Sequence, residues 1–422
     1  MSLALLRGRF PQLAPWIEAA PGPLRIERLD GPHPALRLDG VQLASRHDPF
    51  SEAQHQARLV PIDAPRATVY GFAQGELVRV LLARTALRAL RVVVLAPAAA
   101  REVLARHEAD WLEDERVELV HPAGLAELEL PFCASPADLR LACDEAARLR
   151  DLVVLELATP LIRRHQGERA GVLLARIAAN EQRFAADRDV GELFDSRQGA
   201  SLCVAAAGPT LARHYPELRA RAADLIAVDA ALKPLLEAGV VPTFVLTQDP
   251  HEEGMQRVFA VPRTGLESCR LVYFPEVASE VLAAWPGQRL AARGTGALHR
   301  RAPNTLQRST LWSSGSVVHP AVDLAVRLGA QRVELFGADF AMPGGQSHVE
   351  GCAWQQRWEL GPGATWVHDG GGRRVPSLPN LVGYLRDLER YIADHEEIEF
   401  VSRSSAGAAI RGAAIVEACH AG

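Results

Sequence analysis

Short apolar runs alternate with longer amphipathic segments along most of this chain. "ATVY" (67–70), "RVVVL" (91–95), "LCVAAA" (202–207) and "VELF" (333–336) are typical of buried strands. Each run ends at Gly, Pro or Asp, and most are followed by apolar residues at helical spacing. Buried strands that alternate with helices predict an α/β protein built on doubly wound parallel sheets, with helices on both faces.

The pattern occurs twice, so we predict two Rossmann-like domains, at residues 1–197 and 198–422. In the first, "LRIERLDGPHPALRLDGVQL" (24–43) predicts a hairpin, and "VELVHPAGLAEL" (117–128) and "DLVVLELATP" (151–160) predict further strands. A long helix over 171–200 ends in a polar, Gly-containing connector near Arg197, where we place the boundary.

The second domain repeats the alternation with more informative loops. Residues 201–208 predict a strand, 210–223 one helix, and 224–239 a strand followed by a helix. Further strands are expected at "PTFVLT", "CRLVYF", "RVELF" and "EIEFVS", and helices at 313–330 and 379–395. The segment "WQQRWELGPGATWVHDGGGRRVPSLPN" (354–380), with Trp354, Trp358 and Trp366, predicts a long loop.

Composition supports a globular protein and narrows its partners. The chain has 422 residues, of which 48% are hydrophobic and 23% charged, values typical of folded domains. Its net charge of -5 gives no basic surface for nucleic acid or an anionic membrane, so we expect neither partner. Six scattered cysteines without a CxxC pair predict reduced, buried thiols and no zinc site. The first residues have no apolar core of the signal-peptide kind, and we expect a cytoplasmic protein.

The turn at Gly208, Pro209 and Thr210 separates a strand from a helix. A turn without bulky side chains lets a ligand phosphate reach backbone N–H groups and the positive end of a helix. An ordinary packing turn, with Pro209 at the helix start, accounts for the same residues. The Gly71–Gly75 turn of the first half lacks a following acid at nucleotide-binding spacing, so there we favour packing.

Polar residues follow three other strands of the second half. Asp229 ends "LIAV", Gln248 and Asp249 end "TFVLT", and Asp339 follows "VELF". Each acid alone suits a helix cap or an Asx turn. Because the carboxyl ends of parallel strands share one edge of a sheet, their repetition favours a ligand crevice.

These motifs resemble a known family. "AAGPTL", "LIAVDAALKPLLEAGVVPTFVLTQDP" and "SGSVVHPAVDLAVRLGAQRVELFGADFAMPGGQSHVEG" look like the motility accessory factor (Maf) family of flagellin glycosyltransferases, across about Asp195–Gly351. The central domain of that family is called MptE-like, because it resembles a 6-hydroxymethylpterin diphosphokinase. "HDPFSEA", "VYGFAQGELVRVLL" and "SSAGAAIRG" look like segments nearer its two ends.

The resemblance implies a sialyltransferase-like C-terminal domain. It implies transfer of a nonulosonic acid, of the pseudaminic or legionaminic type, from a CMP-sugar to Ser or Thr of flagellin. A single leaving phosphate needs no metal bridge, so we expect no cofactor beyond the donor and no metal site.

Donor binding is assigned to residues on the strand-end loops and one helix start. The donor candidates are Gly208, Pro209, Thr210, Asp229, Gln248, Asp249, Ser314, Gly315 and Ser316. Ser314, Gly315 and Ser316 precede the helix "VVHPAVDLAV" and suit either phosphate binding or an ordinary N-cap. We predict at this stage that Gly208→Val blocks the donor and leaves the fold largely intact.

His348 is the first candidate for the base that removes the acceptor proton, and Asp339 the second. His348 follows the Gly344-Gly345 loop, and an imidazole on such a loop suits proton removal; a surface histidine is the alternative. His319, followed by Pro320, is expected to be structural.

Two other functions fit the pattern. A pyrophosphokinase would use ATP with Mg²⁺ held by Asp229, Asp249 and Asp339. A catalytically silent flagellin-binding factor would keep the crevice without using it.

Overall fold

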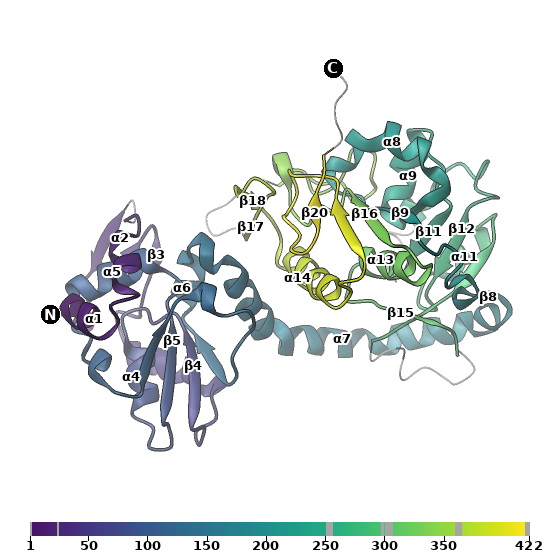
Figure 1. Ribbon diagram of the computed structural model, residues 1–422. Helices are drawn as coiled ribbons and strands as arrows, with labels where there is room; N and C mark the ends of the chain where they lie inside the picture. The colour runs from purple at the N-terminus through teal and green to yellow at the C-terminus, as the bar shows by residue number, and fades with distance from the viewer. Residues whose placement is uncertain are drawn as a thin grey trace. The chain divides into compact units, whose positions relative to one another are not determined.

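The computed structural model describes residues 2–22, 25–249, 256–296, 299, 307–358 and 365–417, without the side chains of 161–169. It forms two compact units, Met1–Pro160 and Leu161–Gly422 (Figure 1). Both contain a parallel sheet in a Rossmann-like arrangement, which confirms the predicted α/β class. The functional division at residue 197 stays a prediction; the compact units divide earlier, within a helix.

The first unit is built on a four-stranded parallel sheet. Its strand order is β6-β5-β4-β7, so the first strand in sequence lies inside the sheet and the chain reverses direction beside it. The strands are β4 (Arg66–Tyr70), β5 (Ala89–Val93), β6 (Val117–Val120) and β7 (Phe132–Ala134), and the helices between and after them are α4 (Glu76–Leu82), α5 (Pro97–Arg106) and α6 (Pro136–Leu141).

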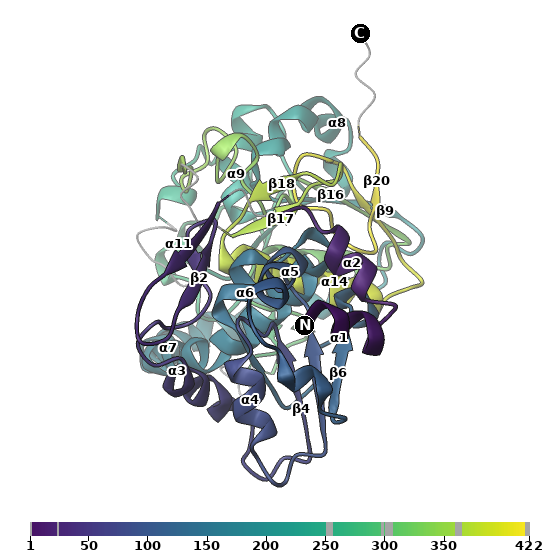
Figure 2. The ribbon, with the colours of Figure 1, turned by 90° about the vertical axis from the view of Figure 1, so that its left-hand side faces the viewer.

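Residues before this sheet form the predicted hairpin and three short helices. β1 (Ile26–Leu29) pairs antiparallel with β2 (Ala35–Leu38), which also pairs with β3 (Val41–Gln42). Helix α3 (Pro49–Gln56) begins at Asp48, whose carboxylate accepts a hydrogen bond from Ser51 N–H at 2.8 Å. Helices α1 (Ser2–Arg9) and α2 (Ala14–Ala19) lie beside α5 (Figure 2).

The strand predicted at residues 151–160 is wrong. These residues belong to α7 (Ala147–Ala186), a helix of 40 residues with Pro160 inside it. A short apolar run fits a buried strand and a helix segment equally well, and Pro160, which ends this run, lies inside the helix here rather than at its end. Within the described residues, no helix combines the length and apolarity needed to cross a bilayer.

The second unit contains a nine-stranded sheet whose neighbouring strands pair in parallel. Its order is β20-β19-β16-β9-β10-β11-β12-β13-β8, and the chain reverses direction between β9 and β16. The strands are β8 (Arg188–Asp189), β9 (Ser201–Ala205), β10 (Leu225–Val228), β11 (Phe244–Thr247), β12 (Arg270–Tyr273), β13 (Arg289–Ala291), β16 (Arg332–Phe336), β19 (Glu399–Ser402) and β20 (Ala414–Ile415).

Helices cover both faces of this sheet (Figure 1). On one side lie α8 (Tyr215–Ala220) and α9 (Asp229–Glu237), and on the other α13 (Val318–Arg327) and α14 (Pro379–Ala393). α11 (Ser279–Ala284) follows β12, and the small pair β14 (Arg293–Gly294) and β15 (Thr310–Leu311) precedes α13. The predicted loop over 354–380 contains an antiparallel pair, β17 (Trp366–His368) and β18 (Arg374–Pro376), so that prediction holds only in part.

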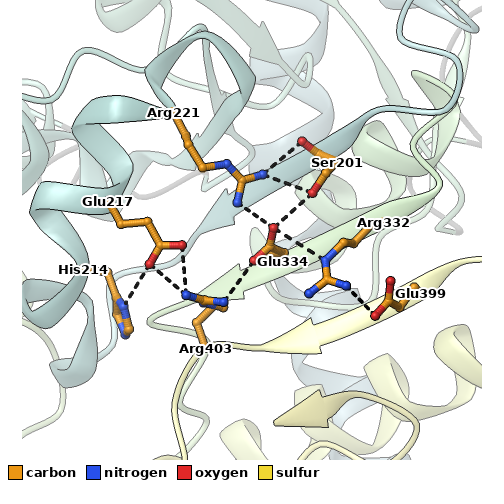
Figure 3. Close-up of polar contacts among 8 residues, drawn as sticks. All are labelled: Ser201, His214, Glu217, Arg221, Arg332, Glu334, Glu399 and Arg403. Atoms are coloured by element: carbon orange, nitrogen blue, oxygen red, sulfur yellow. Dashed lines mark hydrogen bonds and ion pairs between the residues drawn. The ribbon is translucent and has the colours of Figure 1, made fainter. Parts of the chain in front are cut away.

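A network of charged side chains surrounds Glu334, the buried acid of β16 (Figure 3). Glu334 of β16 accepts hydrogen bonds from Arg221 at 2.5 Å and Ser201 at 3.0 Å, and Arg403 lies 3.4 Å from its other oxygen. Burial opposes ionisation of Glu334, but the Arg221 hydrogen bond and the nearby guanidinium charges outweigh it and hold its pKa below the usual value. Ser201, Arg332 and Glu399 are the first residues of their strands. The network therefore extends from the amino ends of these strands to Arg403, which directly follows β19.

Candidate functional site

The carboxyl ends of β16, β9, β10 and β11 are consecutive along one edge of the second sheet. All four strands are parallel, so the loops that follow them emerge on the same side. Ligands of open α/β sheets bind at this edge, where the strand order reverses. In this unit the reversal lies between β9 and β16, which places the loops after Ala205 and Phe336 next to each other.

The turn after β9 is closed by the loop after β16. Gly208 N–H donates to the Gly337 carbonyl at 2.8 Å. Thr210 donates twice to Asp339, from N–H to Oδ2 at 2.8 Å and from Oγ1 to Oδ1 at 2.6 Å. The structure thus brings two predicted site residues together, but they bind each other, so these groups are not free to bind a ligand.

The helix predicted at 210–223 is interrupted. Pro209 begins a 3-10 helix that ends at His214, and the α-helix α8 covers only Tyr215–Ala220. The backbone after Gly208 therefore does not present a full α-helical N-terminus to a ligand.

Asp339 is enclosed by the protein. It is 3% exposed, and burial raises the pKa of its carboxyl, while the two Thr210 hydrogen bonds act in the opposite direction. Both carboxylate oxygens face donors of the adjacent turn. This geometry does not suit the proton-accepting role considered for it from the sequence.

His348 lies beside the same turn. Val349 N–H donates to the Ala207 carbonyl at 2.9 Å, which fixes the histidine loop against the residues before Gly208. The ring is half-buried, and its Nδ1 lies 3.0 Å from Ser347 Oγ. Burial lowers the pKa of His348, so the ring is neutral at pH 7 and can accept a proton. A hydrogen bond with the Trp354 backbone acts in the opposite direction and partly offsets the effect of burial.

A second polar group follows β10 and β11. Asp229 begins α9 and is buried, with Oδ2 accepting from Thr247 Oγ1 and Oδ1 from Ala230 N–H, both at 2.7 Å. Burial is the main cause that raises the pKa of Asp229 to about 7, and the charge of Asp249 contributes in the same direction, while the hydrogen bonds from Thr247 and Ala230 oppose it. Asp229 and Asp249 are therefore close enough to interact, as their places after adjacent strands predict.

The raised pKa of Asp229 gives a testable pH dependence. The folded protein holds this proton up to about pH 7, whereas the ordinary pKa is 3.8. Its contribution to stability is fully present below that ordinary value and is lost as the pH rises through 7. Asn at this position accepts from Ala230 N–H and donates to Thr247. Asp229→Asn is therefore expected to gain melting temperature relative to wild type between about pH 5 and pH 8. The melting temperatures of wild type and Asp229→Asn are measured across this pH range, with Asp224→Asn as the control variant. If the difference between wild type and Asp229→Asn does not change with pH, the raised pKa is contradicted.

Residues from the α13 entry and α14 complete this second group. Ser313 Oγ donates to Gln248 Oε1 at 2.9 Å, and the charge of Asp249 contributes to the raised pKa of Tyr384, after burial. Gly315 has φ +88°, and a Cβ there would lie 2.8 Å from the Tyr384 ring. The sequence did not indicate Ser313 or Tyr384, because nothing in the local pattern links them to β11.

Two of the three candidate residues before α13 have hydrogen-bond partners. Ser314 Oγ donates to Asp387 of α14 at 2.6 Å, and Ser316 Oγ accepts from Val318 N–H at 3.3 Å. The N-cap residue of α13 is Val317, and the helix has no side-chain cap hydrogen bond. His319 is in the core, with Nε2 2.9 Å from the Tyr384 carbonyl, and burial lowers its pKa.

The group around Asp339 and His348 and the group around Asp229 and Gln248 lie at the same edge of the second sheet. Burial raises the pKa of Cys352 to about 11, and the charge of Asp229 adds to the effect. The loop that carries His348 and Cys352 therefore runs close to Asp229. An open pocket of about 420 Å³ lies between α13 and α14 and takes in Ser314 and Asp387. The other predicted donor residues do not line that pocket.

The expectation that Gly208→Val leaves the fold intact is wrong. A Cβ on Gly208 would lie 2.3 Å from the Gly337 carbonyl oxygen and 2.4 Å from Asp339 Oδ2. Carbon atoms do not approach buried backbone this closely, so the turn would have to open.

Metal ligands are not gathered at this edge. Within the described ranges, no three His, Cys, Asp or Glu side chains lie close enough to hold a metal ion. Of the acids considered for Mg²⁺, Asp339 is bonded to Thr210 while Asp229 is bonded to Thr247.

A family model matches the centre of the chain. Residues 176–345 match the model described as "6-hydroxymethylpterin diphosphokinase MptE-like". The matched segment includes β9, β10, β11 and β16 and all the predicted donor residues, and it ends three residues before His348. No curated protein sequence matches the chain.

Two solved structures align with the chain over different lengths. The structure of a Maf glycosyltransferase from Magnetospirillum magneticum AMB-1 aligns with 98% of this chain and 73% of that chain, at 14% identity and a TM-score of 0.46. Spermidine synthase from Thermotoga maritima aligns with 31% of this chain and 50% of that chain, at 15% identity and a TM-score of 0.24.

Proposed function

We propose that this chain, whose residues 176–345 are MptE-like, is a glycosyltransferase. It moves a nonulosonic acid of the pseudaminic or legionaminic type from a CMP-sugar to Ser or Thr hydroxyls of flagellin, in the cytoplasm and without a further cofactor. The observation that carries the proposal is the position of His348. The Val349–Ala207 hydrogen bond sets a neutral imidazole beside the turn at the strand-order reversal, where the fold binds ligands.

In the proposed reaction the acceptor hydroxyl oxygen bonds to the anomeric carbon of the sugar. The bond from that carbon to the phosphate oxygen breaks, and its electron pair leaves with CMP. Nε2 of His348 takes the hydroxyl proton. Because burial keeps His348 neutral at pH 7, the ring is in the protonation state that this step requires.

The second polar group supports donor binding. Two hydrogen-bonded pairs lie at the carboxyl ends of β10 and β11. Asp229 accepts from Thr247, and Gln248 accepts from Ser313. Such paired groups suit the ribose and base of a nucleotide, which present both donors and acceptors. Within the described residues, the N–H groups of Gly315 and Ser316 form no hydrogen bond, and they precede the ten-residue helix α13. They suit the single phosphate of the donor.

Ligand-dependent melting tests this assignment against the pyrophosphokinase alternative. CMP is expected to raise the melting temperature in the presence of EDTA, whereas ATP with Mg²⁺ leaves it unchanged. A ligand at about 100 times its Kd stabilises the folded state by about 2.7 kcal/mol, which is well within detection. Protection by ATP with Mg²⁺ alone would replace the proposal with the pyrophosphokinase. Transfer is then measured by the intact mass of flagellin incubated with the chain and a CMP-nonulosonic acid.

A further inference from the structure

We propose that Asp339 is a resident anion: its carboxylate fills the place in the Gly208–Thr210 turn that a ligand phosphate would take. It thereby acts as a positioning residue for the edge that carries His348, and the donor phosphate binds elsewhere on that edge. The second statement rests on the proposed function, whereas the first concerns the turn alone.

The carboxylate uses the donors that a phosphate would need. Thr210 offers its N–H and its hydroxyl, and both are taken by Asp339, at 2.8 and 2.6 Å. Thr210 is 1% exposed and Asp339 3% exposed, so the pair is closed to solvent. A ligand phosphate could reach Thr210 only by displacing a buried carboxylate, which would be left without its two hydrogen bonds.

Two glycines make room for the carboxylate. A Cβ on Gly208 would lie 2.4 Å from Asp339 Oδ2, and a Cβ on Gly407 would lie 2.6 Å from Asp339 Oδ1. The glycine of the turn therefore admits an internal side chain, which is a different requirement from admitting a ligand.

Asp339 also connects three loops of the edge. Its carboxylate holds the loop after β9, and its carbonyl accepts from Ala408 N–H at 2.7 Å, in the loop after β19. The loop after β9 in turn accepts the Val349 N–H that places His348. Asp339 thus influences the candidate base through the backbone around Ala207.

The first unit contains the same arrangement, formed from different residues. In its sheet, β7 lies across the strand-order reversal from β4, as β16 does from β9. Asp138, after β7, accepts from Ala73 N–H at 2.9 Å in the turn after β4. A Cβ on Gly71 would lie 2.2 Å from the Asp138 Cβ, and Asp138 is 4% exposed. In both sheets, therefore, an aspartate that follows one strand accepts a hydrogen bond from the turn after the neighbouring strand across the strand-order reversal.

The test compares Asp339→Ala and Asp339→Asn with the matched variants Asp138→Ala and Asp138→Asn. Hydrogen exchange of the Thr210 and Ala73 amides is measured in the full chain, with and without formate or neutral formamide. Asp339→Ala is expected to speed exchange at Thr210 about tenfold, as loss of a charge-assisted hydrogen bond does, and to leave Ala73 unchanged. Formate is expected to restore protection because it replaces the carboxylate, and formamide is expected to do so far less. Asp138→Ala is expected to speed exchange at Ala73 and to leave Thr210 unchanged.

Asp339→Asn keeps the test decisive if the alanine variant does not fold. Its amide oxygen accepts Thr210 N–H, and the Thr210 hydroxyl rotates to accept from the amide nitrogen. A positioning role predicts that this variant keeps kcat within about tenfold of wild type, with the acid limb of the pH profile unchanged. A turnover loss as deep as that of His348→Ala, together with loss of that limb, would make Asp339 the base.

Failure of formate to restore Thr210 protection in a folded alanine variant would overturn the resident anion. These exchange measurements require no turnover. Should wild type fail to bind CMP while formate still rescues Asp339→Ala, the proposed function falls and the resident anion stands.

Discussion

Replacing His348 by alanine is expected to lower kcat by about 10²–10⁴-fold, the range typical of a lost general base. Donor affinity is expected to change by less than about threefold, because the ring lies on the loop after β16, where its Nδ1 contacts Ser347 rather than the Asp229 group. Initial rates with a CMP-sugar and flagellin, together with CMP titration, give the two quantities separately.

The pH profile checks the same assignment. Burial lowers the pKa of His348 below its ordinary value of 6.5. The ring is therefore neutral at any pH above this lowered pKa. Turnover is therefore expected to fall as the pH decreases through that pKa, and this acid limb is expected to vanish in His348→Ala. Glu350→Ala, an exposed change two residues away, is the control and keeps the limb.

Two outcomes would move the base elsewhere. Equal losses of turnover and CMP affinity would indicate that His348 binds the donor. Unchanged motility, with flagellin bound equally well by His348→Ala and Asp339→Asn, would favour the non-catalytic flagellin-binding factor.

The strands around the site could be predicted because their signals are local. β9, β10, β11 and β16 are short apolar runs that end at Gly, Asp or Gln, and a parallel sheet forces such ends onto one edge. The expected meeting of Asp229 and Asp249 follows from that rule, and their electrostatic interaction agrees with it. The strand at 151–160 failed for the opposite reason, since an apolar run of that length has no local feature that separates strand from helix.

The partners of the site residues could not be predicted. Asp339 and Thr210 are 129 positions apart, and Ser314 and Asp387 are 73 apart. An acid after a strand has the same sequence pattern whether it faces a ligand or a neighbouring turn. Only the packing of loops across the strand-order reversal decides between these, and that packing depends on residues such as Gly407, far along the chain.

Gly208→Val is expected to destabilise the second unit by about 3 kcal/mol or more, the upper range for overpacking in a buried turn. The first atom of the new side chain would already overlap the Gly337 carbonyl and the Asp339 carboxylate. Relief requires that Asp339 leave Thr210, so the cost includes a buried carboxylate without its hydrogen bonds.

Urea unfolding monitored in the second unit measures the change. Gly296→Val, in the same unit, is the control, because no atom of the described residues lies within 4 Å of a Cβ at Gly296, and its midpoint is expected to stay close to wild type. If Gly208→Val instead unfolds at the wild-type urea concentration but no longer binds CMP, the turn is an open donor site. The carboxylate of Asp339 would then yield its place to the ligand, because a valine that fits without cost requires that the space beside Gly208 be free.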